Sequence, residues 1–160
     1  MAGVIAGALK QQSKFHSREQ EVLLGLRIAT ARILEPWEKF LKTTADLTPN
    51  QYNVLRILRG SDPARVTCGE IAERMISRDP DVTRLVDRLS RRGLVARVRG
   101  RQDRRVVEVA ITDSGREVLR GLDPHVARMP KAMLGHLGAR KLENMVRLLE
   151  DVLSGLGAFP

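Results

Sequence analysis

The stretch Arg78–Arg105, with the sequence RDPDVTRLVDRLSRRGLVARVRGRQDRR, decides how the rest of the chain is organised. In its first half, Val82, Leu85, Val86 and Leu89 recur at the spacing of one helical face. We expect that face to be buried, because it is apolar throughout. The charged residues between these positions then fall on the opposite, outward face of the helix.

Both ends of this predicted helix carry residues that favour helix termini. Asp79 is suited to be the N-cap, Pro80 the first helical residue, and Asp81 a second acid near the positive end of the helix dipole. Gly93 follows the last turn and favours termination. The pattern therefore predicts a short helix that begins at Asp79–Asp81 and ends before Gly93.

The second half of the stretch has the alternation of strands rather than of helices. Residues 94–99 and 105–111 both have a period of two, and residues 100–104 between them contain the turn. Two alternating runs joined by a short loop predict a β-hairpin.

Positive charge is concentrated in the same stretch. The chain has a formal net charge of +9, and residues 88–105 contain eight arginines and a single acid, Asp103. A local excess of arginine indicates a polyanionic partner. The alternative is a basic face that only contacts solvent.

The segments on either side are predicted to be helical. Aromatic residues make up only 3% of the chain, so its core must be aliphatic. Residues 18–44 carry one helical apolar stripe that includes Leu23 and Leu26, and Pro36 should kink that helix or split it in two. Pro124 and Pro130 should bend or break the helix that follows the hairpin.

Further helix ends can be placed along the chain. Thr48 is a predicted N-cap, and the helix that it starts is expected to end at Gly60. Residues 66–67 are a candidate for a very short strand, and Thr67 or Gly69 opens the next helix. Residues 112–114 are predicted to start the next helix, with Glu117 placed to complete a capping box with Ser114 or to follow Asp113 closely. The last helix, about residues 139–156, has an apolar face formed by Leu142, Met145, Val146, Leu149, Val152, Leu153 and Leu156.

Several functional classes receive no support from the sequence. The single cysteine, Cys68, excludes an intramolecular disulfide and fits a reducing compartment. No apolar run is long enough to span a membrane and the N-terminus does not look like a signal peptide, so we expect a cytoplasmic protein. The three histidines are far apart in sequence, and no catalytic motif is recognisable, so we expect neither a metal, nor a cofactor, nor an enzyme.

The predicted order of elements is that of a mainly α winged helix-turn-helix with a small β-hairpin wing and additional helices at both ends. The sequence also resembles the MarR family (multiple antibiotic resistance regulators) over about residues 20–156. The resemblance rests on the ordered motifs LTPNQYNVL at 47–55, EIAER at 70–74, VTRLVDRL at 82–89, RGLV at 92–95, DRR at 103–105 and ITDSGR at 111–116.

This resemblance implies a homodimeric DNA-binding transcription regulator, usually a repressor, that binds a pseudo-palindromic operator and is often released by a small phenolic or other anionic aromatic ligand. It implies an N-terminal arm at 1–17, a dimerisation helix at 18–46, a winged helix-turn-helix at 47–112 and dimerisation helices at 113–160. The residues expected in the dimer interface are Leu23, Leu26, Leu142, Met145, Leu149, Val152, Leu153 and Leu156.

The candidate DNA-binding residues follow from the outward face of the helix and from the hairpin. Arg84 and Arg88 can each hold a guanine edge in a bidentate pair, although Asp87 could instead pair with Arg84 or Arg91 along the helix. Arg104 is the candidate for the minor groove. The other candidate contacts are Arg78, Asp81, Thr83, Asp87, Arg99 and Arg101, while the resemblance implies that Asp103 and Arg105 brace the wing.

Three further points stay open. Trp37 and Tyr52 are candidates for an effector pocket and equally for the core. Cys68, next to a helix N-terminus, could be redox-active or simply a small packed residue. Two other functions compete with that of an operator-binding regulator: a winged-helix module that binds proteins, and an architectural protein that binds nucleic acid without sequence specificity.

Overall fold

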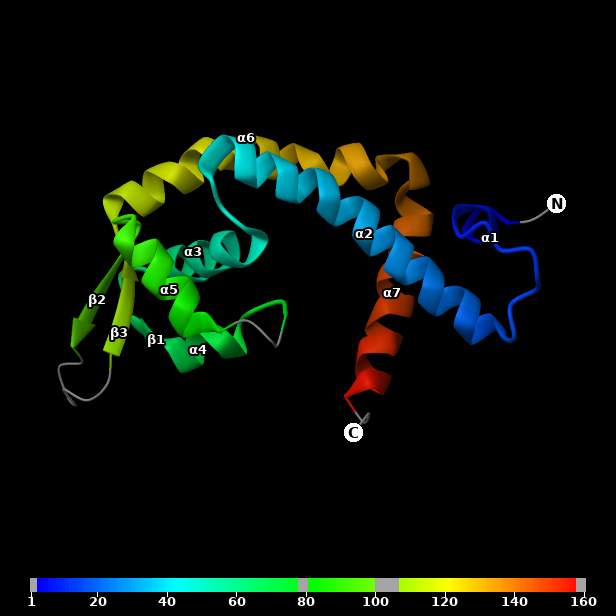
Figure 1. Cartoon of the computed structure of the whole chain (residues 1–160), viewed down its shortest axis with the longest axis horizontal. Helices are drawn as coiled ribbons and strands as arrows, with labels where there is room; N and C mark the ends of the chain where they lie inside the picture. The colour runs from blue at the N-terminus through cyan, green and yellow to red at the C-terminus, as the bar shows by residue number, and fades with distance from the viewer. Residues whose placement is uncertain (1–2, 78–80, 100–106, 158–160) are drawn as a thin grey trace. The chain divides into compact units, whose positions relative to one another are not determined.

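The computed structural model describes residues 3–77, 81–99 and 107–157, which form helices and one small antiparallel sheet (Figure 1). The chain divides into two units, Met1–Gly121 and Leu122–Pro160. The elements in chain order are α1 Val4–Ala8, α2 Arg18–Ala45, α3 Pro49–Ser61, β1 Val66–Thr67, α4 Cys68–Glu73, α5 Val82–Arg91, β2 Val95–Arg99, β3 Val107–Ile111, α6 Asp113–Leu134, a 3₁₀ turn Gly135–Leu137 and α7 Ala139–Leu156.

Capping residues explain where α3 and α4 begin. Thr48 accepts a hydrogen bond from the backbone N–H of Gln51, whose side chain accepts in return from the N–H of Thr48. Thr67 and Glu70 form the same reciprocal pair at the start of α4. The predicted caps Thr48 and Thr67 are therefore confirmed. Helix α3 extends to Ser61, so the predicted end at Gly60 was wrong by one residue.

Helix α5 has the predicted buried face but begins later than predicted. Val82, Val86 and Leu89 are buried and Leu85 is half-buried. Asp81 is the N-cap, since its carboxylate accepts from the N–H of Arg84. The prediction of Asp79 as cap and Pro80 as first helical residue was thus wrong, because the next acid along the chain caps the helix. Both residues lie outside the described part.

The sheet confirms the predicted hairpin and the short strand before it. The strand order is β1-β3-β2, with both pairs antiparallel. Strand β2 pairs with β3 from Val95 opposite Ile111 to Arg99 opposite Val107, and Val66 of β1 lies opposite Val109. In Figure 1 the hairpin lies beside α5 within the first unit. The turn between its strands falls in the undescribed residues 100–106.

Helix α6 follows β3 closely, and the side chain of Thr112, the first of the three residues predicted to start it, caps the helix. The Thr112 hydroxyl accepts from the N–H of Gly115 and donates to the carbonyl of Gly93 at 2.7 Å. A Cβ on Gly115 would lie 2.2 Å from the carbonyl oxygen of Leu94, so only glycine permits this close approach. The first turn of α6 is therefore joined to the start of the hairpin, and the cap is Thr112 rather than Ser114 or Asp113.

The three prolines do not divide the helices that contain them. Pro36 lies inside α2, and Pro124 and Pro130 lie inside α6, which continues through both. Of the outcomes predicted for these prolines, the split of the first helix and the break of α6 were wrong, while a kink or bend stays a prediction. A proline removes one backbone donor, and the hydrogen bonds of the turns on either side still hold the helix together.

The predicted dimerisation residues mostly leave apolar side chains exposed on the single chain. In α2, Leu23 is 60% exposed and Leu26 is half-buried. In α7, which has the predicted bounds, Leu142 is half-buried and the other five are exposed: Met145, Leu149, Val152, Leu153 and Leu156. A helix with a wide uncovered apolar face needs another surface to cover it.

Candidate nucleic-acid interface

The outward face of α5 exposes the residues predicted to contact a polyanion. Thr83, Arg84 and Arg88 are exposed, and Asp81 is exposed at the helix start. The Nε atom of Arg84 lies 3.0 Å from Oδ2 of Asp81, with 80% of the arginine side chain exposed. This pairing orients the guanidinium near the N-terminal end of α5. Because an exposed ion pair is weak, Arg84 can leave it at little cost.

The middle of α5 is joined to the hairpin by an ion pair between elements. Asp87 accepts from Nη2 of Arg97 on β2 at 2.6 Å, and the same atom lies 3.4 Å from the carbonyl oxygen of Thr83. The expected alternative, in which Asp87 pairs with Arg84 or Arg91 along the helix, was wrong. Strand β2 places the guanidinium of Arg97 closer to this carboxylate than the arginines of α5 itself lie. The spacing of residues along one helix cannot predict a contact with another element.

The other candidate DNA-contacting residues come from the wing and from the segment before α5. Arg78, Arg101, Asp103, Arg104 and Arg105 lie outside the described residues. Arg99 is the last residue of β2, and its backbone lies opposite Val107. The roles predicted for these six residues stay predictions.

A separate cavity lies between α2, α3 and the segment after α4. Its volume is about 660 Å³, and both candidate aromatic residues line it, together with Arg56, Ile76 and Ser77. Trp37 and Tyr52 meet edge to face with ring centroids 5.0 Å apart. Tyr52 is 8% exposed and Trp37 is half-buried, so these rings belong both to the core and to the cavity wall.

Polar groups in this cavity connect it to the segment that leads into α5. Nε and Nη2 of Arg56 both donate to Oδ1 of Asn53, at 3.2 and 2.9 Å. The buried Asn53 amide lies 3.4 Å from the sulfur of Met75, and the Ser77 hydroxyl lies 3.4 Å from Oδ1 of Asn50. Helical spacing had identified the rings but not Asn53 or Arg56. The spacing of three residues between Asn53 and Arg56 in one predicted helix could have indicated this hydrogen bond.

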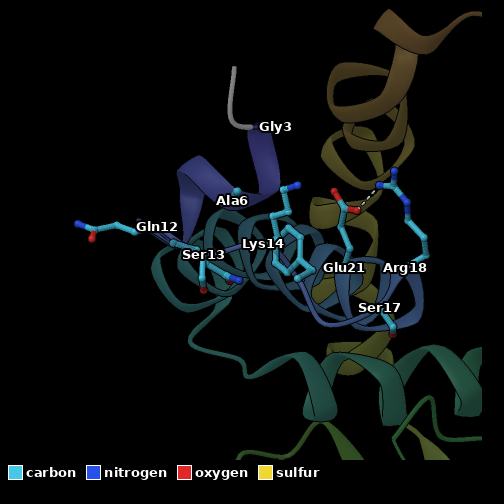
Figure 2. A pocket seen from close by; sticks show the side chains of 10 residues that line it. Gly3, Ala6, Gln12, Ser13, Lys14, Ser17, Arg18 and Glu21 are labelled. Carbon is cyan, nitrogen blue, oxygen red and sulfur yellow. Dashed lines mark hydrogen bonds and ion pairs between the residues drawn. The ribbon is translucent and has the colours of Figure 1, made fainter.

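A second cavity, of about 640 Å³, lies where α1 and residues 11–15 meet the start of α2 (Figure 2). Most of the residues that line it are polar or charged, although their apolar atoms contribute much of its surface. Arg18 and Glu21 form an ion pair of 2.6 Å at its edge. The sequence pattern of residues 1–17 does not predict this cavity.

The cysteine, the metal-ligating side chains and the hydropathy of the helices bear on other possible functions. Cys68 is half-buried at the first position of α4. Within residues 3–77, 81–99 and 107–157, no group of three or more His, Cys, Asp or Glu side chains could hold a metal ion. Over the same residues, no helix is long and apolar enough to cross a membrane.

Comparison with known proteins points to one family. The MarR family model matches residues 47–107. The repressor MdtR of Bacillus subtilis is 40% identical over 86 residues, which cover 51% of this chain and 54% of that protein, so the chain spans about half the length of this curated relative.

Solved structures extend the likeness over most of the chain. The crystal structure of a MarR transcription factor from Planctomyces limnophilus is 41% identical, with a TM-score of 0.64 over 86% of this chain and 98% of the other. Bordetella bronchiseptica BpsR, whose DNA binding is regulated by 6-hydroxynicotinic acid, is 26% identical, with a TM-score of 0.73 over 88% of this chain and 97% of its own. The chain belongs to the MarR family.

Proposed function

We propose that this chain is a sequence-specific DNA-binding transcription regulator that acts as a homodimer and represses its target genes. The observation that carries this proposal is the exposed face of α5, where Thr83, Arg84 and Arg88 project outward while the apolar face is buried. In a winged helix-turn-helix, a helix with this division enters the major groove, and its N-terminal residues contact base edges. The repressor function of MdtR supports the direction of regulation.

Arg84 is the principal base reader in this proposal. Arg84 lies in the first turn of α5, and its guanidinium can form a bidentate pair with a guanine, worth about 1–3 kcal/mol of discrimination. Thr83 is suited to a phosphate or a thymine methyl, and Asp81 either caps the helix only or also accepts from a cytosine amino group. Arg88 lies one turn further from the N-terminus and reads a base at the edge of the site.

The hairpin is proposed to contact the backbone and the minor groove. Arg104 is assigned to the minor groove, and Arg99 and Arg101 to phosphates. Arg78, which precedes α5, is a further proposed DNA contact. Asp103 and Arg105 brace the wing in the family pattern.

The exposed apolar residues of α2 and α7 are assigned to the dimer interface. Two copies would place their α5 helices in successive major grooves, about 34–36 Å apart. The boundaries 18–46, 47–112 and 113–160 are proposed as the dimerisation, DNA-binding and second dimerisation regions. A regulator of this kind acts where the DNA is, which supports a cytoplasmic location.

The cavity lined by Trp37 and Tyr52 is proposed as the effector site. Its two rings offer apolar and aromatic surface, and Arg56 offers a cation to an anionic group. The regulation of BpsR by an aromatic acid supports this ligand class. Trp37 is the single tryptophan of the chain, so its fluorescence reports directly on occupation of the cavity.

Selection of bound DNA from a random pool, followed by footprinting, tests the main proposal. We expect a pseudo-palindromic site whose half-sites are one helical turn apart. Substitution Arg84→Ala should relax the preference at one base pair per half-site. A protein-binding module would select no DNA, whereas an architectural protein would bind every sequence with little discrimination and leave no footprint of defined length.

A further inference from the structure

We propose that Arg92 is a positioning residue that fixes the C-terminal end of α5 to the C-terminal end of α2, and thereby sets the spacing that the protein accepts between two half-sites. Arg92 directly follows α5. Its Nη1 donates to the carbonyl oxygen of Asp46 at 2.6 Å, and its Nη2 donates to that of Ala45 at 2.8 Å. One guanidinium therefore bridges two consecutive carbonyls more than forty residues away in sequence.

These carbonyls are accessible because of the way α2 ends. The last carbonyls of a helix have no partner within it. Asp46 adopts a left-handed conformation, with φ of 50°, and its N–H bonds back to the carbonyl of Lys42, while the N–H of Leu47 bonds to that of Leu41. This arrangement closes the helix and leaves the carbonyls of Ala45 and Asp46 for an external donor. Arginine suits such a pair, because its planar fork carries two parallel donors.

The contact of Arg92 with the carbonyls of Ala45 and Asp46 forms a joint between α5 and α2, and neighbouring residues stabilise this joint. The Asp46 carboxylate lies 4.0 Å from Nη1 of Arg92. Its hydrogen bond and charge interaction with Lys42 lower the pKa of Asp46, and the charge of Arg92 adds to this effect. Leu47, directly after the bonded carbonyls, is 1% exposed, so the chain on the α2 side is anchored in the core.

The joint orients α5 rather than holding the fold together. Helix α5 packs against α3, α4 and β2, and its buried residues Val86 and Leu89 are fully covered. The Arg92 side chain is 35% exposed, which makes its hydrogen bonds a modest part of the total stability. Losing them would let α5, together with α3, α4 and β2 that pack against it, change its angle to α2, while the buried contacts of α5 itself stay in place.

The functional consequence rests on the proposed dimeric DNA-binding function. An α-helix of ten residues is about 15 Å long. A tilt of about 10° at its C-terminal end therefore moves its N-terminal end by about 2.6 Å, and two such helices in a dimer change their separation by about 5 Å. That exceeds the rise of one base pair, about 3.4 Å. A free joint would thus let the dimer accept half-sites one base pair closer together or further apart.

The experiment compares Arg92→Gln and Arg92→Lys with the matched control Arg91→Gln, which removes a charge from the same end of α5. Affinity is measured on the selected operator, on an isolated half-site, and on operators whose spacer is one base pair longer or shorter. We expect both Arg92 variants to keep half-site affinity within about twofold of wild type and to bind the full operator about tenfold more weakly. They should also bind operators with different spacer lengths with nearly equal affinity. Arg91→Gln should weaken binding to all sites alike and keep the spacer preference.

Two results would overturn the proposal. One is an unchanged spacer preference in both Arg92 variants. The other is an equal loss on half-site and full operator, which would indicate a local defect in α5. Circular dichroism verifies folding, and Arg92→Lys retains the charge if Arg92→Gln does not fold.

A DNA-free measurement separates this inference from the proposed function. Nitroxide labels at Arg27→Cys on α2 and Arg84→Cys on α5, in a Cys68→Ser background and diluted with unlabelled protein, report the distance between the two helices. We expect one narrow distance distribution in the parent and in Arg91→Gln, and a broad one in the Arg92 variants. If the wild type selects no DNA, the proposed function fails, while an unchanged distribution in Arg92→Gln refutes the joint itself.

Discussion

The ion pair between Asp87 and Arg97 leads to a prediction that separates bracing from base reading. Asp87 lies on the outward side of α5, where a carboxylate could accept from a cytosine amino group. It is instead 2.6 Å from Nη2 of Arg97, and the two side chains are 37% and 35% exposed. We predict that its main role is to hold the base of the hairpin against the recognition helix.

The expected magnitude follows from this geometry. Exposed ion pairs contribute about 0.2–1 kcal/mol, and the short contact between half-exposed partners places this one near the upper end. A double-mutant cycle of Asp87→Asn and Arg97→Gln should therefore give a coupling of about 1 kcal/mol in the free energy of unfolding. A free-energy difference of about 1 kcal/mol corresponds to a factor of about five in an equilibrium constant, which sets the scale that we expect for DNA affinity.

The appropriate assay is the ratio of specific to non-specific DNA affinity, since removal of an acid near DNA strengthens binding to every sequence. We expect each single substitution to lower this ratio about fivefold and the double substitution to lower it no further. The set of preferred bases should stay the same. If Asp87→Asn changes the preference at one base pair while Arg97→Gln does not, Asp87 reads a base and the bracing role is refuted. Additive losses would also refute it.

Three further predictions concern stability and the effector. Thr48→Ala, which removes the cap of α3, should cost about 1 kcal/mol and lower the melting temperature by about 2–4 °C in a thermal unfolding experiment. Hydrogen bonds from Thr67 lower the pKa of Glu70, so its stabilising contribution is complete above about pH 4.3 and is lost as the pH falls through the lowered pKa; the melting temperatures of wild type and Glu70→Gln should converge in that acid range. Arg56→Gln should leave DNA affinity within about threefold but weaken the quenching of Trp37 by aromatic carboxylic acids at least tenfold, and equal quenching in both proteins would exclude the guanidinium from the site.

Local signals in the sequence were sufficient for most of the fold. The caps Thr48 and Thr67 act within three residues, and the alternation that predicts the hairpin acts within one strand, so each could be read directly. The start of α5 was harder to predict, because Asp79 and Asp81 both suit the cap position, and the structure has Asp81 as the cap. A proline removes one backbone donor and therefore suggests a helix break, whereas the hydrogen bonds of the surrounding turns decide whether the helix continues.

The contacts that position the candidate site were not accessible in this way. Arg97 reaches Asp87 across ten residues and Arg92 reaches Ala45 across forty-seven, from one element to another. In the sequence, both arginines belong to the same basic stretch as those assigned to DNA. Charge counting therefore identifies the interface but does not distinguish the arginines that bind the protein itself from those left for a partner.

That distinction explains how α5 can present a fixed reading surface. Its C-terminal end is joined to α2 through Arg92, and its middle is joined to β2 through Asp87. At its N-terminal end the charged contact is the local pair of Arg84 with Asp81, which solvent screens. The helix is thus held at its C-terminal end and in its middle, while the guanidinium of Arg84 is free to exchange its partner. Substitutions at these held positions should alter where the helix lies, and substitutions at Arg84 should alter which base it prefers.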